Sequence, residues 1–246
     1  GLTRRPYHEV SEWLATTDPK LLSSRRVQAE LLFRRIGITF QVYGEHAENE
    51  RLIPFDILPR ILSRGEWTRL ERGLIQRVKA LNMFLKDIYG PGDVVRAGVI
   101  PADLIYRNSG YCPEMAGRHT PHDIHVHIAG VDIVRTSDED FYVLEDNART
   151  PSGVSYMLEN REVMMRLCPD LFARHRVAPI DDYPNALLAT LKSVAPQRAT
   201  GDPAIVLLTP GQHNSAFYEH SFLADKLGVE LVEGRDLFVR DDVVYM

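Results

Sequence analysis

One stretch, residues 123–155 (DIHVHIAGVDIVRTSDEDFYVLEDNARTPSGVS), constrains the fold more than any other part of the chain. It predicts two strands joined by a short acidic turn, followed by a Gly/Ser loop that opens a helix. A four-residue turn at 137–140, a common hairpin length, places Asp132 directly opposite Glu145. Because side chains alternate along a strand, Asn147 shares one face with both carboxylates.

The predicted face has an electrostatic conflict. Two carboxylates that pair across strands repel each other and destabilise the hairpin. Counting outward from Thr136 opposite Phe141, the same face also carries Val134, Phe141 and Val143, so it is not a freely solvated rim. A hard divalent cation resolves this conflict, and two carboxylates with an amide oxygen suit Mg²⁺, with phosphate oxygens and water completing its shell.

We therefore predict a metal site made of Asp132, Glu145 and Asn147. The ordinary alternative is a solvated acidic rim, or ion pairs with Arg135 or Arg149.

The loop after the hairpin, residues 148–153, precedes a predicted helix at 154–167. Amide groups at a helix N-terminus favour anions, so the loop is a candidate for binding a phosphate or a substrate carboxylate. The cofactor-binding candidates are Ser152, Gly153 and Ser155. Arg149 is the candidate catalytic cation, and an ion pair with Asp146 or Glu145 is its structural alternative.

Four histidines, His119, His122, His125 and His127, stand within nine residues. Imidazole is a favoured transition-metal ligand, so a zinc or iron site is one interpretation. No Cys or HExxH motif accompanies the cluster. The other interpretation places one or two of these histidines in an active cleft and the rest on a surface loop.

The remaining chain predicts a mixed α/β architecture. Residues 1–36 have the start and stop signals of helices, and residues 66–88 carry a continuous apolar stripe that indicates a scaffold helix. A buried-type strand at 204–208, a helix at 215–227 and a strand at 229–232 predict a βαβ unit.

The turn TPGQHNS, residues 209–215, follows the first strand of that unit. Open α/β sheets bind ligands outside the carboxyl ends of their strands. Gln212, His213 and Asn214 are therefore the substrate-binding candidates.

Composition excludes several classes of function. A net charge of −5 argues against a nucleic-acid partner, and no apolar run is long enough to span a membrane. The start GLTRRPYHEV is no signal peptide, and Cys112 and Cys168 have no metal-type spacing. We expect two buried free thiols and a cytoplasmic protein.

These residues carry a resemblance. Asp132 on one strand, with Glu145 and Asn147 on the next, resembles the Mg²⁺-binding half of ATP-grasp ligases. The run LEDNARTPSGVSYMLENR (144–161) resembles the circularly permuted ATP-grasp proteins related to glutathionylspermidine synthase. The runs at 38–62, 125–135 and 209–239 resemble the same group. One departure is Gly130, where many ATP-grasp ligases carry an arginine, which leaves the residue that stabilises an acyl phosphate unassigned.

The resemblance implies a fold and a division of the chain. The expected fold class is α/β (mixed α+β), with an ATP-grasp-like metal-binding half, a Rossmann-like βαβ unit and N-terminal helices. The expected segments are an N-terminal helical segment at 1–36, the metal-binding half at 37–180 and a truncated α/β unit at 181–246. Because the sequence stops on the second strand of a predicted hairpin at 236–246, we expect an N-terminal fragment of a longer protein.

The resemblance also implies a function: an ATP-dependent carboxylate–amine ligase that uses ATP and Mg²⁺ and proceeds through an acyl phosphate. The implied partners are a small-molecule carboxylate and an amine or peptide. The ATP-gripping lysines are expected beyond Met246, so these 246 residues alone should bind nucleotide weakly. Two alternatives remain open: a His-rich metallohydrolase that uses His122, His125, His127 and Asp132, and a non-catalytic module that binds peptide or protein.

Overall fold

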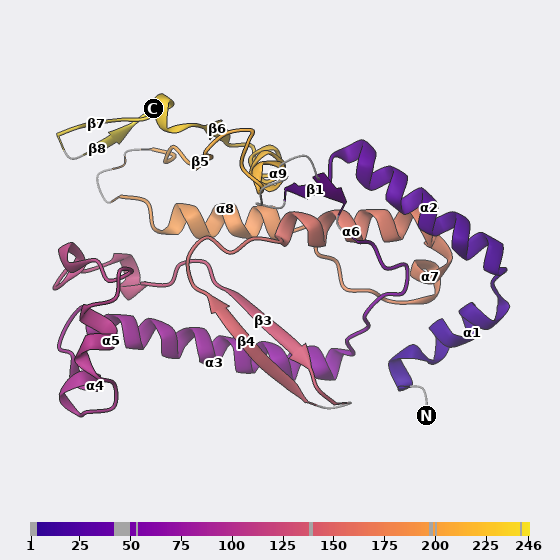
Figure 1. Ribbon diagram of the computed structural model, residues 1–246, viewed down its shortest axis with the longest axis horizontal. Coiled ribbons are helices and arrows are strands. Elements are labelled where there is room, and N and C mark those ends of the chain that lie inside the picture. The colour runs from indigo at the N-terminus through magenta and orange to yellow at the C-terminus, as the bar shows by residue number, and fades with distance from the viewer. Residues whose placement is uncertain are drawn as a thin grey trace. The chain divides into compact units, whose positions relative to one another are not determined.

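The computed structural model describes residues 4–41, 50–52, 54–137, 140–196, 199, 201–241 and 243–246. The chain is a mixture of helices and short strands arranged in two compact units (Figure 1). Unit 1 comprises Gly1–Ile61 and Ser152–Met246, and unit 2 is Leu62–Pro151. Among the described residues, no helix has the length and apolar character needed to cross a membrane.

The described part of unit 1 contains the 3-10 helices η1 (Arg5–Tyr7) and η4 (Gly234–Asp236), and the helices α1 (His8–Thr16), α2 (Pro19–Ile36), α6 (Val154–Leu167), α7 (Pro169–Arg174), α8 (Tyr183–Ser193) and α9 (Phe217–Leu227). Its strands are β1 (Thr39–Gln41), β2 (Glu50–Leu52), β5 (Val206–Leu208), β6 (Glu230–Val232), β7 (Phe238–Arg240) and β8 (Val243–Tyr245). Unit 2 contains α3 (Arg64–Ile88), α4 (Asp93–Arg96), α5 (Ala102–Tyr106), η2 (Pro113–Met115), η3 (Pro121–Asp123), β3 (Gly130–Arg135) and β4 (Phe141–Asn147).

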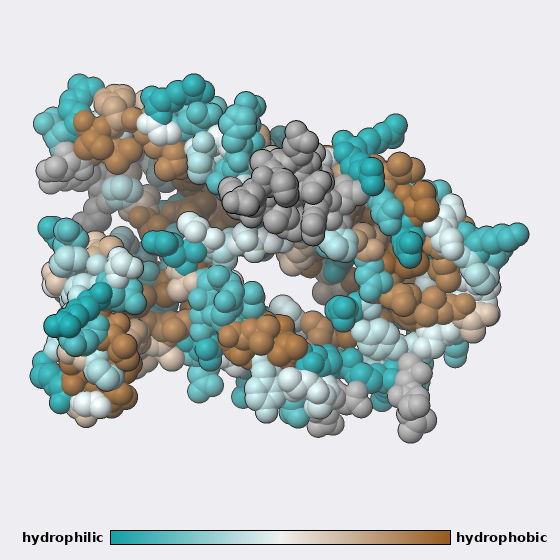
Figure 2. All heavy atoms as spheres, viewed as in Figure 1, coloured by the Kyte–Doolittle hydropathy of each residue, from teal (hydrophilic) through white to brown (hydrophobic). Residues whose placement is uncertain are grey.

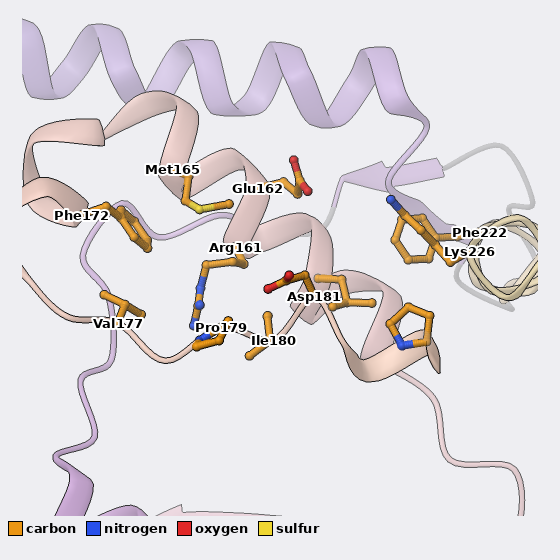
Figure 3. A pocket seen from close by; sticks show the side chains of 12 residues that line it. Arg161, Glu162, Met165, Phe172, Val177, Pro179, Ile180, Asp181, Phe222 and Lys226 are labelled. Carbon is orange, nitrogen blue, oxygen red and sulfur yellow. The ribbon is translucent and has the colours of Figure 1, made fainter. Parts of the chain in front are cut away.

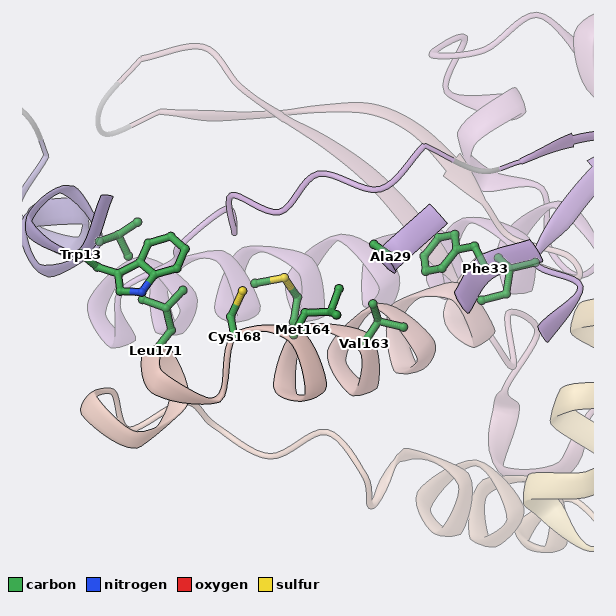
Figure 4. Close-up of a cluster of buried hydrophobic side chains, with 10 residues drawn as sticks. Trp13, Ala29, Phe33, Val163, Met164, Cys168 and Leu171 are labelled. Atoms are coloured by element: carbon green, nitrogen blue, oxygen red, sulfur yellow. The ribbon is translucent and has the colours of Figure 1, made fainter. Parts of the chain in front are cut away.

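The N-terminal helices share a core with the helices that follow the hairpin. Val10 and Trp13 from α1, and Ala29 and Phe33 from α2, pack with apolar side chains of α6 and α7 (Figure 4). The side chains contributed from that side are Val163, Met164, Leu167, Cys168 and Leu171. This shared core places residues 1–61 and 152–246 in one compact unit, and the division into segments at 1–36, 37–180 and 181–246 stays a prediction.

Local signals set the ends of α2 as expected. The side chain of Asp18 accepts a hydrogen bond from the Lys20 amide at 2.9 Å, and Pro19 fills the first helical position. Gly37 ends the helix in the left-handed conformation, with φ of 80°.

Of the two cysteines, Cys168 is buried in the core, whereas Cys112 is exposed, so the prediction of a buried thiol was wrong for Cys112.

A parallel βαβ arrangement is present in unit 1. Strand β5 pairs with β6 in parallel, from Val206 opposite Glu230 to Leu208 opposite Val232, and α9 connects them. A second predicted hairpin is also present, because β7 pairs antiparallel with β8. Asp242 of its turn lies outside the described residues.

Unit 2 is built on α3, which begins with a capping box between Ser63 and Glu66. Its apolar stripe is half-buried to buried along most of its length, but Trp67 at its start is 50% exposed. The β3–β4 hairpin crosses this helix (Figure 1), and its two ends are joined to α3 by ion pairs. Apolar side chains gather over the hairpin (Figure 2), where Val134, Tyr142 and Leu144 are exposed.

Candidate functional site

The hairpin pairs Asp132 with Glu145, as predicted, but the strand register near the turn differs from the predicted one. Arg135 rather than Thr136 lies opposite Phe141, so the strands begin one residue out of step with the expected register. The register shifts between Asp132 and Ile133, where Leu144 has no partner and forms a bulge. The bulge restores the predicted pair. Asp138 and Glu139 of the predicted turn lie outside the described residues.

The bulge changes which side chains share the carboxylate face. Leu144 is an extra residue in β4. The side chains between it and the turn, at residues 141–143, therefore point to the opposite face from the one that simple alternation from Glu145 predicts. Phe141 and Val143 are half-buried, on the side toward α3, so their predicted place beside Asp132 was wrong. Val134 does share the exposed face with Asp132 and Glu145. The two carboxylates therefore face solvent.

Asn147 lies beside this pair. Its Nδ2 is 3.4 Å from Oε1 of Glu145, a long hydrogen bond along one face of β4. Among the residues that the structure describes, neither Asp132 nor Glu145 forms an ion pair. The alternative in which Arg135 neutralises them is not realised, because Nη1 of Arg135 lies 2.8 Å from Oε1 of Glu66. Two adjacent carboxylates and an amide form an oxygen-donor set that fits Mg²⁺.

The opposite face of β4 is fixed to α3. Asp146 accepts two hydrogen bonds from Nε of Arg77, at 2.7 and 3.0 Å, and one from Nη2 at 2.6 Å. These bonds lower the pKa of the Asp146 carboxyl against the opposing effect of burial. At the other end of the hairpin, burial alone would raise the pKa of Glu66, but hydrogen bonds from Ser63 and the Arg135 guanidinium lower it to about 2.

The predicted anion site at the start of α6 already holds a carboxylate. Glu219 of α9 is 4% exposed and accepts from the Gly153 amide at 2.9 and 2.7 Å. Its Oε2 also accepts from the Ser155 amide at 3.2 Å and from the Ser155 hydroxyl at 2.6 Å. The sequence predicted a phosphate or a substrate carboxylate at these groups, whereas the anion that they contact in the structure is a side chain of the same chain. Ser152 donates none of these hydrogen bonds to Glu219.

The other predicted residues belong to separate places. Arg149 is exposed in unit 2 and makes no ion pair within the described part of the chain, so its pairing with Asp146 or Glu145 is not realised. In unit 1, Gln212 and His213 are exposed, and Oδ1 of Asn214 accepts from the Ala216 amide at 2.9 Å. Asn214 thus helps to form the turn into α9.

Behind that turn, buried Thr209 and half-buried His220 form a polar pair. The Thr209 hydroxyl accepts from the Gly211 amide at 3.2 Å and lies 2.9 Å from Nδ1 of His220. Since that hydroxyl already accepts one hydrogen bond, its own hydrogen is available for Nδ1, which favours the neutral tautomer of His220 with its proton on Nε2. Burial lowers the pKa of His220, and the nearby Glu219 partly opposes this.

The histidine cluster does not assemble a metal site among the described residues. No three His, Cys, Asp or Glu side chains there are placed to hold a metal ion together. Oδ1 of Asn82 on α3 instead accepts from the amides of His125 and Val126, at 2.7 and 2.9 Å, and fixes this segment to the helix. The metallohydrolase alternative therefore gains no support.

A pocket of about 470 Å³ lies in unit 1 between α6, residues 177–181 and α9 (Figure 3). Its apolar lining includes Met165 and Phe172, and its charged lining includes Arg161 and Asp181. The Arg161 guanidinium donates to the Ala178 carbonyl at 2.8 Å and so supports the wall. None of the predicted site residues lines this pocket.

The sequence analysis missed three residues that contact partners far away in the sequence: Arg77, Glu66 and Glu219. Glu66 carried a detectable signal, because Ser63 followed three residues later by Glu66 is a capping-box pattern. The pairing of Arg77 and Glu219 with residues more than 60 positions away has no comparable local pattern.

The whole length of this sequence aligns with proteins from several organisms. An uncharacterized protein from Synechocystis sp. is 46% identical over 246 residues, and one from Mycobacterium tuberculosis is 48% identical. The chain spans 51% and 44% of their lengths. A Frankia casuarinae protein named "Putative glutamate–cysteine ligase 2-2" is 41% identical over 247 residues, and the chain spans 28% of it.

A family model described as a circularly permuted ATP-grasp matches residues 59–246. The match includes the hairpin with Asp132 and Glu145, α6 and the βαβ arrangement. Since it covers most of the sequence, the chain belongs to the circularly permuted ATP-grasp family.

Proposed function

We propose that this protein is part of an ATP-dependent carboxylate–amine ligase that works through an acyl phosphate. The observation that carries the proposal is the exposed pair of Asp132 and Glu145, with Asn147 beside it. ATP-grasp membership supports ATP as the cofactor, and the names of the Frankia relatives support ligase chemistry. Glutamate–cysteine ligation joins a carboxylate to an amine, which is the substrate class we propose, with a peptide as an alternative amine.

In this proposal Asp132, Glu145 and Asn147 are the oxygen ligands of Mg²⁺. The ion would supply neutralisation of phosphate charge during phosphoryl transfer. The chain's own contribution is rigidity, because Arg77 fixes Asp146 and thereby holds Glu145 on the opposite side of the strand. Arg149 is the proposed catalytic residue, and its guanidinium would stabilise the negative charge that develops on the substrate during the reaction.

The other assignments stay with the proposal. Gln212, His213 and Asn214 are proposed substrate contacts, and Ser152, Gly153 and Ser155 are proposed cofactor contacts. For Gly153 and Ser155 this role requires that the ligand displace the Glu219 carboxylate from their amides. The Rossmann-like character of the βαβ unit, the kinship with glutathionylspermidine synthase and a cytoplasmic location are likewise proposed.

The test is MgATP binding by the full-length protein, measured by calorimetry. Asp132→Asn and Glu145→Gln should each weaken Mg²⁺-dependent binding by at least about tenfold. Asp140→Asn, in the same hairpin but outside the ligand set, is the matched control and should bind as the parent does. If both ligand variants bind MgATP like the parent, the site assignment is wrong.

Substrate identity requires a separate experiment. The full-length protein would be incubated with ATP and a pool of amino acids, peptides and polyamines, and the products detected by mass spectrometry. An ATP-dependent amide product that is absent with Glu145→Gln supports the ligase. ATP-independent binding of a peptide that survives Glu145→Ala would instead favour a non-catalytic module.

A further inference from the structure

Gly130 and Pro151 approach each other so closely that residue 130 has no room for a side chain. A β-carbon at residue 130 would lie 2.6 Å from Cβ of Pro151 and 3.7 Å from Cβ of Asn147. The first distance is far inside van der Waals contact, and the opposing atom belongs to a proline ring that cannot rotate away. The Pro151 ring therefore fills the space into which a side chain at 130 would point.

This contact lies on the carboxylate face of the hairpin. Gly130 is the register partner of Asn147, two residues along β3 from Asp132. Alternation places the side-chain direction of residue 130 on the same face as Asp132. Pro151 thus covers the end of the face that carries Asp132, Glu145 and Asn147.

The segment between Asn147 and Pro151 has a backbone conformation that it would not adopt alone. Thr150 has φ of 46°, in the left-handed region that β-branched residues avoid. It also precedes a proline, which further disfavours helical backbone angles. Such a conformation persists only where the surrounding packing fixes it. The contact of Pro151 with Gly130 is the packing observed at this point.

We propose that Gly130 and Pro151 are positioning residues for the metal-binding face. Their contact, which we call the Gly–Pro lock, holds residues 148–150 in place and keeps the Asn147 amide beside Glu145. The assignment of a metal to this face rests on the proposed function. The lock itself is a steric relationship that can be tested without metal.

The first test measures thermal unfolding without Mg²⁺ for Gly130→Ala, Pro151→Gly, Pro151→Ala and the two double variants. Gly130→Ala should lower the unfolding midpoint, because its methyl group meets the proline ring. In Gly130→Ala/Pro151→Gly the opposing β-carbon is gone, so the loss should be smaller than the sum of the single losses. Pro151→Ala keeps that β-carbon, and its double variant should show no such relief. Equal behaviour of the two double variants would overturn the lock.

The second test measures the Mg²⁺ concentration that gives half-maximal ATP binding to the full-length protein. Gly130→Ala and Pro151→Gly should each raise it by about tenfold or more, as supporting residues of metal sites do. Gly130→Ala/Pro151→Gly should be more stable than the sum of the single losses predicts, but its Mg²⁺ affinity should stay low, because the Gly–Pro lock is still absent. If the contact served stability alone, this double variant would recover Mg²⁺ affinity together with stability. That result would overturn the positioning role.

Failures of the two proposals can be told apart. Weak binding by Asp132→Asn and Glu145→Gln, together with parent-like Mg²⁺ dependence in Gly130→Ala and Pro151→Gly, overturns the lock alone. Parent-like binding by Asp132→Asn and Glu145→Gln overturns the metal site and with it the role of the lock there. If Gly130→Ala does not fold, Pro151→Gly carries the test, since it removes the contact without a clash.

Discussion

Asp132 and Glu145 face each other across β3 and β4 immediately after the bulge at Leu144, and both point to solvent. Like charges in direct cross-strand positions repel, so this pair opposes the hairpin that presents it. Such an arrangement is stabilised by a cation that binds the folded state. In the proposed function, where Mg²⁺ binds this pair, the sign of the pair's effect on stability depends on Mg²⁺.

Neutralising either carboxylate should stabilise the protein when Mg²⁺ is absent. Asp132→Asn or Glu145→Gln removes the repulsion, a gain of about 0.2–1 kcal/mol in the free energy of unfolding. Saturating Mg²⁺ should reverse the order, because the parent binds it at least about tenfold more tightly and gains about 2.7 kcal/mol at a hundred times its Kd, more than the variants gain. Denaturant unfolding with and without Mg²⁺ measures both effects. Mg²⁺ stabilisation of the variants equal to that of the parent would contradict the prediction.

Replacing Glu219 should cost more than an ordinary surface change. Glu219→Gln removes a buried charge that accepts from the amides of Gly153 and Ser155 and from the Ser155 hydroxyl. We expect a loss of about 2–4 kcal/mol in the free energy of unfolding. Glu162→Gln, which breaks an exposed pair with Arg166, is the matched control and should cost less than about 0.5 kcal/mol. Urea unfolding of both variants decides the point, and equal losses would contradict it.

The Glu66–Arg135 pair should make unit 2 sensitive to acid. The folded pKa of Glu66 is about 2, below its ordinary value of 4.5, because Ser63 and then Arg135 donate hydrogen bonds to its carboxylate; these bonds stabilise the folded state above pH 4.5. As pH falls from 4.5 toward 2 the unfolded state binds the proton first, and a contribution on the order of 3 kcal/mol is lost. Unfolding of parent and Glu66→Gln across this range tests the prediction. A variant with the same acid-dependent slope would exclude Glu66 as the cause.

His220 should contribute a separate pH effect nearer neutrality. Burial lowers its folded pKa below the ordinary value of 6.5, so protons bind more readily to the unfolded chain. Stability should therefore fall as pH drops through 6.5 and below, and His220→Gln should flatten that part of the profile. Comparison of unfolding midpoints at pH 7.5 and 5.5 measures it, with exposed His213→Gln as control. An equally steep profile for His220→Gln would refute the assignment.

Local patterns predicted the elements well, because their signals lie within a few residues. Asp18, Pro19 and Gly37 mark the ends of α2 in the sequence and do so in the structure. The Asp132–Glu145 pair was predicted correctly although Phe141 was assigned the wrong partner. The one-residue change of register at the turn end of the strands and the bulge at Leu144 cancel each other, and nothing about a leucine in a strand indicates a bulge.

Long-range relationships could not be read in the same way. Glu219 lies on α9, 64 residues after Ser155, and only the folded chain shows that its carboxylate meets the start of α6. Gly130 was recognisable as a departure from the family pattern, but its steric reason depends on Pro151, which follows β4. The predicted metal ligands are close together in the sequence, which is why their pairing could be predicted.

The contact of Glu219 with Gly153 and Ser155 has a consequence for nucleotide recognition. A phosphate that approached the first turn of α6 would meet a built-in competitor, tethered in place at high effective concentration. It would have to displace a charged group whose own hydrogen bonds would then need new partners. Free phosphate should therefore bind poorly there, and a nucleotide would gain most of its affinity from groups elsewhere.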